Sequence, residues 1–219
     1  MSEIGKFYNL DAVRQMYGDI VPVYQNAFAG EPWFEVSKCE DKADVKRCVG
    51  GFSSMPIGLT CEECGNCLIR TAYEREELIA GFERFAEKFP LAWYLERNDA
   101  GVTLASVVWF ASAEDIASEK YQYIPGMRKW MEDLLGKTPV MWLDEIFADR
   151  SKKPSGNLSN FRNMCMGFAD EFGSQTMAFR TINPRLVAAA KRDFEGTSVY
   201  PRNDLVPDRR DFVLINLEQ

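Results

Sequence analysis

The sequence predicts a mixed α/β fold, in which a central sheet carries helices on both faces. An antiparallel hairpin is indicated by two apolar segments around the turn "NDAG", and β-α-β crossovers are indicated by strand-like and helix-like segments that alternate later in the chain. Apolar residues make up 46 % of the 219 residues, which suffices for a sizeable core. We therefore expect a single domain over residues 1–219, with residues 32–70 as a cysteine-rich insertion.

The first half of the chain is expected to hold a short strand, two helices and the hairpin. Residues 6–10 are strand-like, and Asp11 is expected to cap a run with apolar residues at helical spacing, which Pro22 should kink or split. A second helical pattern covers residues 78–89. The hairpin follows over residues 91–112, and its second strand is apolar on both faces, so we expect that strand at the centre of the sheet.

The second half alternates between helices and strands. The first helical stretch should break near Pro125–Gly126, and the last helix should begin with Asn183 as its N-cap. Cys165 falls on an apolar helical stripe and is expected to be a small core residue. The expected helices are 113–136, 157–172 and 183–194, and the expected strands are 139–149, 176–182 and 211–217.

Charge and composition exclude several classes of function. Lys and Arg number 26 against 33 Asp and Glu, a net charge of −7, which argues against a dedicated nucleic-acid binder. There is no histidine, so acid–base chemistry must use carboxylates, Tyr, Lys, Cys, a substrate group or water. The first residues do not resemble a signal peptide and no apolar run is long enough to span a membrane, so we expect a cytoplasmic protein that does not bind membranes and lacks disulfides.

Five of the six cysteines lie in the insertion. Cys61 and Cys64 form a C-x-x-C followed by glycine, which is the spacing of a metal-binding knuckle. Together with Cys39 and Cys48 they form the predicted ligand set of a structural zinc, with iron as the alternative metal. Cys67 can replace one of the four, and free buried cysteines or a redox C-x-x-C are the competing interpretations. Four thiolates leave no open position for water, which argues against a catalytic zinc.

A polar loop lies between the strand that ends near Ala148 and the next helix. It reads "DRSKKPSGN" and places two lysines and Gly156 just before the first helical turn. Free amides at a helix N-terminus, a glycine that permits close approach and nearby positive charge together favour a phosphate group. The alternative is a loop that only caps the helix.

This strand, loop and helix resemble the acetyl-CoA-binding region of the GNAT superfamily of N-acyltransferases. The family's loop has the pattern Q/R-x-x-G-x-G/A, and Lys153-Pro-Ser-Gly156-Asn-Leu158 is similar to it. Lys153 stands in place of Gln or Arg, and Leu158 in place of the second small residue. The order of elements agrees with the family over nearly the whole chain, with residues 32–70 as an extra insertion.

The resemblance implies a GNAT-like, mostly antiparallel sheet and an N-acyltransferase that uses acetyl-CoA. The backbone of the fourth strand would bind the pantetheine arm, the loop amides would hold the pyrophosphate, and Asn183 would contact the cofactor or cap its helix. The implied cofactor-binding residues are Ile146, Ala148, Lys153, Pro154, Ser155, Gly156, Asn157, Leu158 and Asn183.

Direct acyl transfer to an amine needs a base, and the family places acidic residues for this role on the fourth strand. Here these are Asp144 and Glu145, which strand alternation puts on opposite faces. Alternation also puts Glu145 on the face of Met141, Leu143 and Phe147, where apolar neighbours would raise its pKa. We therefore expect Glu145 to be the base, and a plain ion-pair partner is the alternative.

The group that protonates the leaving thiolate is less well defined. The helix after Asn183 lacks the tyrosine that many family members carry, so the resemblance leaves Tyr200 or water for this role. The odd loop and the missing tyrosine motivate an alternative function, a non-catalytic GNAT-like protein that binds acyl-CoA or a partner. A zinc-ribbon adaptor for nucleic acid is a third alternative, which the charge disfavours.

The acceptor is expected to be an amine, either a small molecule or a peptide. The acidic composition favours a basic acceptor such as a polyamine, an aminoglycoside or a protein terminus. Residues 113–136 and the insertion are expected to shape the acceptor cleft or a homodimer contact, and the sequence leaves both open.

Overall fold

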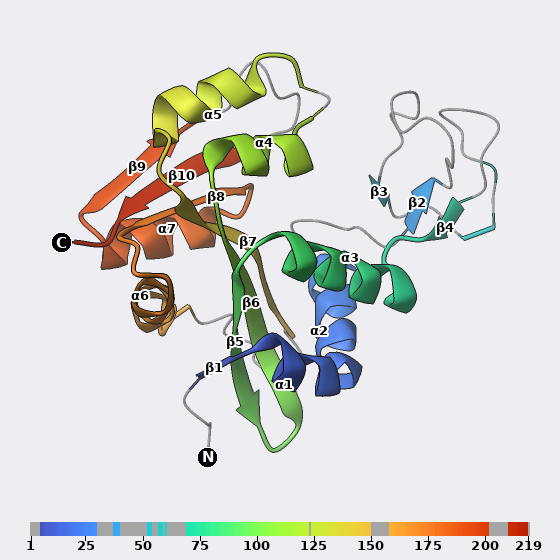
Figure 1. The fold of residues 1–219 in the computed structure, drawn as a ribbon. Coiled ribbons are helices and arrows are strands. Elements are labelled where there is room, and N and C mark those ends of the chain that lie inside the picture. The colour runs from blue at the N-terminus through green and yellow to red at the C-terminus, as the bar shows by residue number, and fades with distance from the viewer. Residues whose placement is uncertain are drawn as a thin grey trace.

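The protein is described here by a computed structural model, which covers residues 5–29, 37–39, 52–53, 57–58, 60, 69–122, 124–149, 158–201 and 210–218. Its main feature is a seven-stranded sheet in the order β1-β5-β6-β7-β8-β10-β9 (Figure 1). Only β7 and β8 pair in parallel, and the other neighbours in this sheet are antiparallel. This confirms the predicted mixed, mostly antiparallel sheet.

The elements follow one another much as the sequence predicts. The strands of the large sheet are β1 (Lys6–Tyr8), β5 (Leu91–Asn98), β6 (Gly101–Ala111), β7 (Val140–Ala148), β8 (Thr176–Thr181), β9 (Gly196–Tyr200) and β10 (Asp211–Asn216). The helices are α1 (Leu10–Gln15), α2 (Tyr17–Ala29), α3 (Arg75–Lys88), α4 (Ala113–Lys120), α5 (Met127–Leu135), α6 (Phe161–Phe172) and α7 (Pro184–Asp193). None of these helices is long and apolar enough to cross a membrane.

The insertion contributes a second, small sheet. Its strands are β2 (Ser37–Cys39), β3 (Phe52–Ser53) and β4 (Ile69–Thr71), in the order β3-β2-β4. Both pairs are antiparallel. In Figure 1 this sheet stands apart from the seven-stranded one and joins it through α3.

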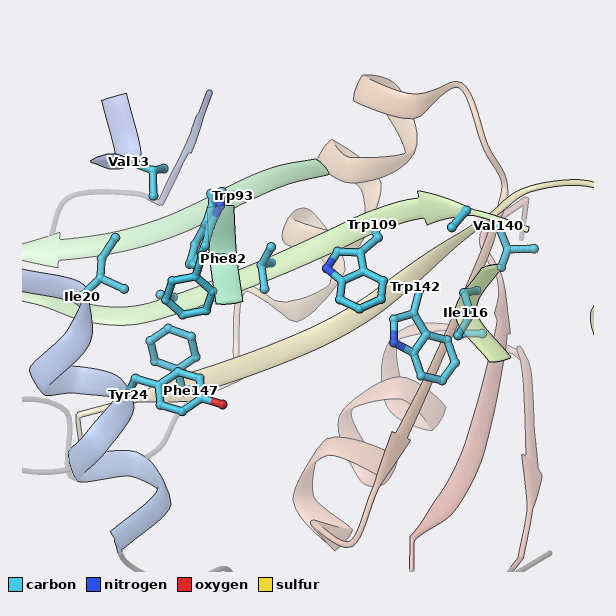
Figure 2. Packing of buried hydrophobic residues seen from close by; sticks show 14 of the residues in the cluster. Val13, Ile20, Tyr24, Phe82, Trp93, Trp109, Ile116, Val140, Trp142 and Phe147 are labelled. Atoms are coloured by element: carbon cyan, nitrogen blue, oxygen red, sulfur yellow. The ribbon is translucent and has the colours of Figure 1, made fainter. Parts of the chain in front are cut away.

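Two buried clusters cover the two faces of the large sheet. Helices α1 to α5 pack on one face, called here the α1–α5 face, while α6 and α7 pack on the other, called the α6–α7 face. Figure 2 shows part of the first cluster, in which Trp109 of β6 and its register partner Trp142 of β7 lie side by side, while Trp93 of β5 lies against Phe82 of α3. Strand β6 is buried on both faces and lies in the interior of the sheet, between β5 and β7, as its apolar sequence predicts.

Local sequence accounts for the hairpin. The turn between β5 and β6 is formed by Asp99 and Ala100, and the side chain of Asn98 accepts a hydrogen bond from the Ala100 amide at 2.8 Å. Gly101 has φ +103°, a conformation that side chains disfavour, so the glycine of "NDAG" is required here. The predicted hairpin is confirmed.

Two details near the N-terminus differ from the prediction. Asn9, not Asp11, caps the first helix, since its side chain accepts from the Ala12 amide at 3.0 Å. The chain breaks at Met16 instead of at Pro22, which lies inside α2. The buried face of α2 offsets the one hydrogen bond that Pro22 cannot donate.

Strand β9, which is short and half polar, was not predicted.

Candidate active site

The two parallel strands of the sheet separate along their length. Ladder pairing joins Met141 to Met177 and Trp142 to Ala178, and the described register extends no further although both strands continue. The β8-facing backbone of β7 beyond Trp142 therefore has no ladder partner in this register. A cavity of about 290 Å³ lies where the strands part.

The cavity reaches both faces of the sheet. Tyr24 and Trp142 in its lining belong to the cluster on the α1–α5 face. Leu143, Phe179 and Leu186 belong to the cluster on the α6–α7 face. The split between β7 and β8 thus forms an opening through the sheet, and ligands that approach from opposite faces can meet in it.

A β-bulge in β7 interrupts the side-chain alternation at this opening. Val107 of β6 pairs with Glu145 and Val108 pairs with Leu143, so Asp144 is an extra residue that lacks a partner in the register. In a bulge, two residues of one strand oppose a single residue of the other, and the alternation shifts by one position.

The shift places the two acidic residues on one face, which corrects the prediction that they lie on opposite faces. Trp142 and Phe147 are an odd number of positions apart, so in a regular strand their side chains would point to opposite faces. Both nevertheless belong to the cluster on the α1–α5 face. Glu145 accompanies Phe147 there and does not share a face with Met141 and Leu143, which pack on the α6–α7 face. Strand alternation does not predict this arrangement, because the bulge arises from the pairing of β7 with β6.

Glu145 and Asp144 each have a defined partner from a helix. The Tyr24 hydroxyl donates to Glu145 Oε1 at 3.2 Å, and the Tyr24 ring packs on Phe147 with centroids 4.8 Å apart (Figure 2). Lys120, at the end of α4, pairs with Asp144 at 2.6 Å. The Asp144 side chain is only 7 % exposed, so this ion pair is shielded from water.

The surroundings raise the pKa of Glu145 to about 7. Burial is the main cause and the Asp144 carboxylate adds to it, while Lys120, Arg210 and the hydrogen bond from Tyr24 act in the opposite direction. Burial also lowers the pKa of Lys120, but Asp144 and Glu145 more than offset this and leave it raised. Near neutral pH, Lys120 is therefore charged, and Glu145 can both accept and release a proton.

Two arginines add positive charge to the same cavity. Arg180 of β8 and Arg210, just before β10, both line it. The Arg180 guanidinium lies over the Tyr121 ring, 5.0 Å from its centroid. Burial raises the pKa of Tyr121, and the charges of Arg180, Lys120 and Arg210 offset this only in part. Arg180 therefore stacks on Tyr121, whose ring packs in the cluster on the α1–α5 face.

The residues predicted for the cofactor are placed as far as the structure describes them. Ile146 lines the cavity and packs, like Ala148 and Leu158, on the α6–α7 face. Asn183 lines the cavity and also caps α7, because its side chain accepts from the Arg185 amide at 3.0 Å. The remaining predicted loop residues, Lys153, Pro154, Ser155, Gly156 and Asn157, lie outside the described residues.

The start of α6 is tied to two other elements. Asn160 stands at the N-cap position, yet its side chain donates to the buried Glu96 of β5 at 3.1 Å instead of capping the helix. Arg192 of α7 donates to the Leu158 carbonyl at 3.0 Å. These contacts hold the first turn of α6 in place without using the Asn160 side chain as its cap.

Tyr200 is not brought to the cavity. It lies in β9, where its ring packs against Phe212 with centroids 6.4 Å apart, and it is absent from the cavity lining. The tyrosines that do line the cavity are Tyr24, Tyr73 and Tyr121. The role predicted for Tyr200 stays a prediction that this geometry does not favour.

Of the predicted metal ligands, Cys39 is described only by its backbone, at the end of β2, and Cys48, Cys61 and Cys64 lie outside the described residues, as does Cys67. Among the described residues, no group of three or more acidic or cysteine side chains is placed to hold a metal ion. Cys165 is free and buried in the cluster on the α6–α7 face, as predicted.

Sequence reasoning missed the site's cations Lys120, Arg180 and Arg210 and its tyrosines Tyr24, Tyr73 and Tyr121. They come from segments far apart in the sequence. Among them, Arg180 offered a signal, because it is the one charged residue of β8.

Comparison with solved structures finds the same fold. One match is a protein from Corynebacterium glutamicum described as histone acetyltransferase HPA2 and related acetyltransferase, with 14 % identity, a TM-score of 0.53, and coverage of 99 % of this chain and 97 % of that one. Another is a polyamine N-acetyltransferase from Drosophila melanogaster, with 8 % identity, a TM-score of 0.53, and coverage of 97 % and 98 %. No family model matches the chain, and no curated protein matches it in sequence. At these identities the likeness confirms the GNAT-like fold.

Proposed function

We propose that the protein is an acetyl-CoA-dependent N-acyltransferase that moves an acetyl group directly to an amine. The observation that carries this proposal is Glu145, a carboxyl with a pKa near 7 at a bulge beside the split of β7 and β8. The cavity beside the split can hold two reactants close together, and a carboxyl with a pKa near neutral pH suits the base that direct acyl transfer to an amine needs.

The exposed edge of β7 suits the cofactor. Beyond Trp142 the backbone facing β8 is outside the ladder, so its amides and carbonyls at Ile146 and Ala148 are suited to an extended arm that contains amide groups. The loop before α6, with Lys153 to Leu158, would hold the pyrophosphate on the helix N-terminus. Asn160 supports this role, because its side chain is engaged by Glu96 and does not cover the first turn.

Glu145 would serve as the base. Bound acetyl-CoA supplies a thioester, whose carbonyl carbon forms a bond to the acceptor nitrogen while the carbon–sulfur bond breaks and the sulfur leaves as a thiolate. The proton lost by the amine goes to Glu145, which the Tyr24 hydroxyl orients. Lys120 balances the charge of Asp144, so the second carboxylate does not push the pKa of Glu145 still higher.

Calorimetric titration with acetyl-CoA, followed by a screen for acetylation of a mixture of amines, tests the proposal. We expect micromolar binding and release of free CoA that depends on an amine. The alternative of a non-catalytic GNAT-like protein predicts binding without release of CoA. If acetyl-CoA does not bind at all, the proposed function is wrong.

We also propose a structural zinc in the insertion, held by Cys39, Cys48, Cys61 and Cys64, with Cys67 able to replace one of them and iron as the alternative metal. One contact supports it: Cys39 of β2 pairs with Ile69 of β4, two residues after Cys67. Since Cys67 precedes Ile69 by only two positions in the chain, a site shared by Cys39 and the "CEECGNC" segment is within reach of the backbone.

Elemental analysis of the purified protein tests the metal. We expect about one zinc per chain, lost when the four cysteines are replaced by serine. A folded protein that contains neither zinc nor iron would show that the site does not exist. The site would pin the insertion to the single domain over residues 1–219, and it has no part in the proposed chemistry.

A further inference from the structure

The described lining of the cavity differs in its charged residues from the chain as a whole. The chain has a net charge of −7, whereas the described lining of the cavity carries the cations Lys120, Arg180 and Arg210 against the carboxylates Asp144 and Glu145. Lys120 and Asp144 form an ion pair. Arg180 and Arg210 are two further cations of the described lining, beside the carboxyl of Glu145, and they disfavour a polycation as its ligand.

The positive charge lies on the face that the cofactor does not use. Arg180 stacks on Tyr121, which packs on the α1–α5 face, and Arg210 acts on both Tyr121 and Glu145. The proposed pyrophosphate site is at the start of α6, on the α6–α7 face. An anion bound by these arginines would therefore belong to the acceptor.

We propose that Arg180 and Arg210 form an anion subsite for the acceptor's carboxylate, so that the acceptor is a small amino acid-like zwitterion whose amine reaches Glu145. This inference rests on the proposed acetyl transfer. Arginine is the side chain best suited to bind a carboxylate through two parallel hydrogen bonds. The cavity volume, about 290 Å³, is near the lower end for small-molecule sites and must also admit the thioester, which favours a small acceptor.

A panel of the common L-amino acids, each tested beside its carboxamide, addresses this subsite. Each pair keeps the amine and the side chain and differs only in the anion. Converting the acid to the amide lowers the amine's pKa and so makes more of it neutral, which by itself favours acetylation of the amide. A preference for the acid therefore has to come from the protein.

Two measurements are made on the purified full-length chain: kcat/KM from release of CoA, and the Kd of each panel member by calorimetry with and without CoA. We expect the preferred acid to exceed its amide at least about tenfold in both. Arg180→Gln and Arg210→Gln should each bring the ratio of acid to amide, measured within the same variant, to about 1. Arg180→Lys should restore part of the preference, and the exposed Arg84→Gln on α3 is the matched control.

The outcomes separate the subsite from the proposed function. If no acid binds more tightly or reacts faster than its amide, or if both glutamine variants fold and keep the preference, the subsite is wrong whatever acetyl-CoA does. If acetyl-CoA neither binds nor is consumed, while an acid binds and loses its affinity in Arg180→Gln, the proposed transfer is wrong and the subsite stands.

Discussion

The two faces of the sheet differ most where β7 and β8 separate. On the α6–α7 face the cavity is lined by Leu143, Phe179 and Leu186, which are apolar. On the α1–α5 face it holds all five charged groups of the described lining, which are Lys120, Asp144, Glu145, Arg180 and Arg210. The comparison teaches that one bulge determines where the two carboxylates lie, because the extra residue Asp144 turns both of them toward the same face.

The largest expected effect comes from replacing Glu145, the proposed general base on the charged face. Glu145→Gln should lower kcat/KM for acetyl transfer by about 10²- to 10⁴-fold, because the amide cannot take the amine's proton. Binding of acetyl-CoA, measured by calorimetry, should not change, since the proposed cofactor site lies toward the other face. Glu87→Gln, an exposed change on α3, is the matched control. Equal activity in the Glu145 and Glu87 variants would remove Glu145 from the mechanism.

A second prediction concerns the shielded ion pair. Lys120→Met should destabilise the fold by roughly 3 kcal/mol in urea unfolding, because it leaves the buried Asp144 carboxylate without its partner. The Lys120 ammonium nitrogen also lies over the Trp109 ring, 4.8 Å from its centroid, so the substitution removes this cation–π contact as well. Lys88→Met, which breaks the more exposed pair with Glu119, should cost less than about 1 kcal/mol. Similar losses in both variants would show that Asp144 is not shielded.

The third prediction concerns how the protonation of Glu145 makes the stability of the fold depend on pH. Its folded-state pKa is raised from 4.5 to about 7, so the folded state holds a proton that the unfolded state loses between these values. This group therefore lowers stability as pH rises through that window. Glu145→Gln removes the penalty and should be more stable than the wild type by about 1–3 kcal/mol at about pH 8, with little difference at about pH 4. A gain of the same size at both pH values would contradict a raised pKa.

The smallest expected effect lies on the apolar face. Asn160→Ala removes the donor to Glu96 and loosens the start of α6, so the KM for acetyl-CoA should rise by about three- to tenfold with kcat unchanged. Asn216→Ala, an exposed change at the end of β10, serves as the control. A fall in kcat with KM unchanged would place Asn160 on the catalytic side instead.

The sequence predicts the parts of the fold that depend on local patterns. The "NDAG" hairpin and the Asn183 cap depend on neighbours within a few residues, and both are confirmed. The facing of Asp144 and Glu145 could not be predicted, because the bulge arises from pairing with β6, some forty residues earlier. Arg180 and Arg210 were not predicted as site residues either, since only the order of β8 and β10 in the sheet brings them together.

The pH dependence of acetyl transfer tests the central claim most directly. With the preferred amine in the screen, kcat/KM of the wild type should rise with pH through a pKa near 7 as Glu145 loses its proton, and this limb should be missing from the residual activity of Glu145→Gln. Asp144→Asn should move the limb to lower pH, because it removes a charge that raises the pKa of Glu145. A wild-type profile without a limb near 7, or the same limb in Glu145→Gln, would contradict the account.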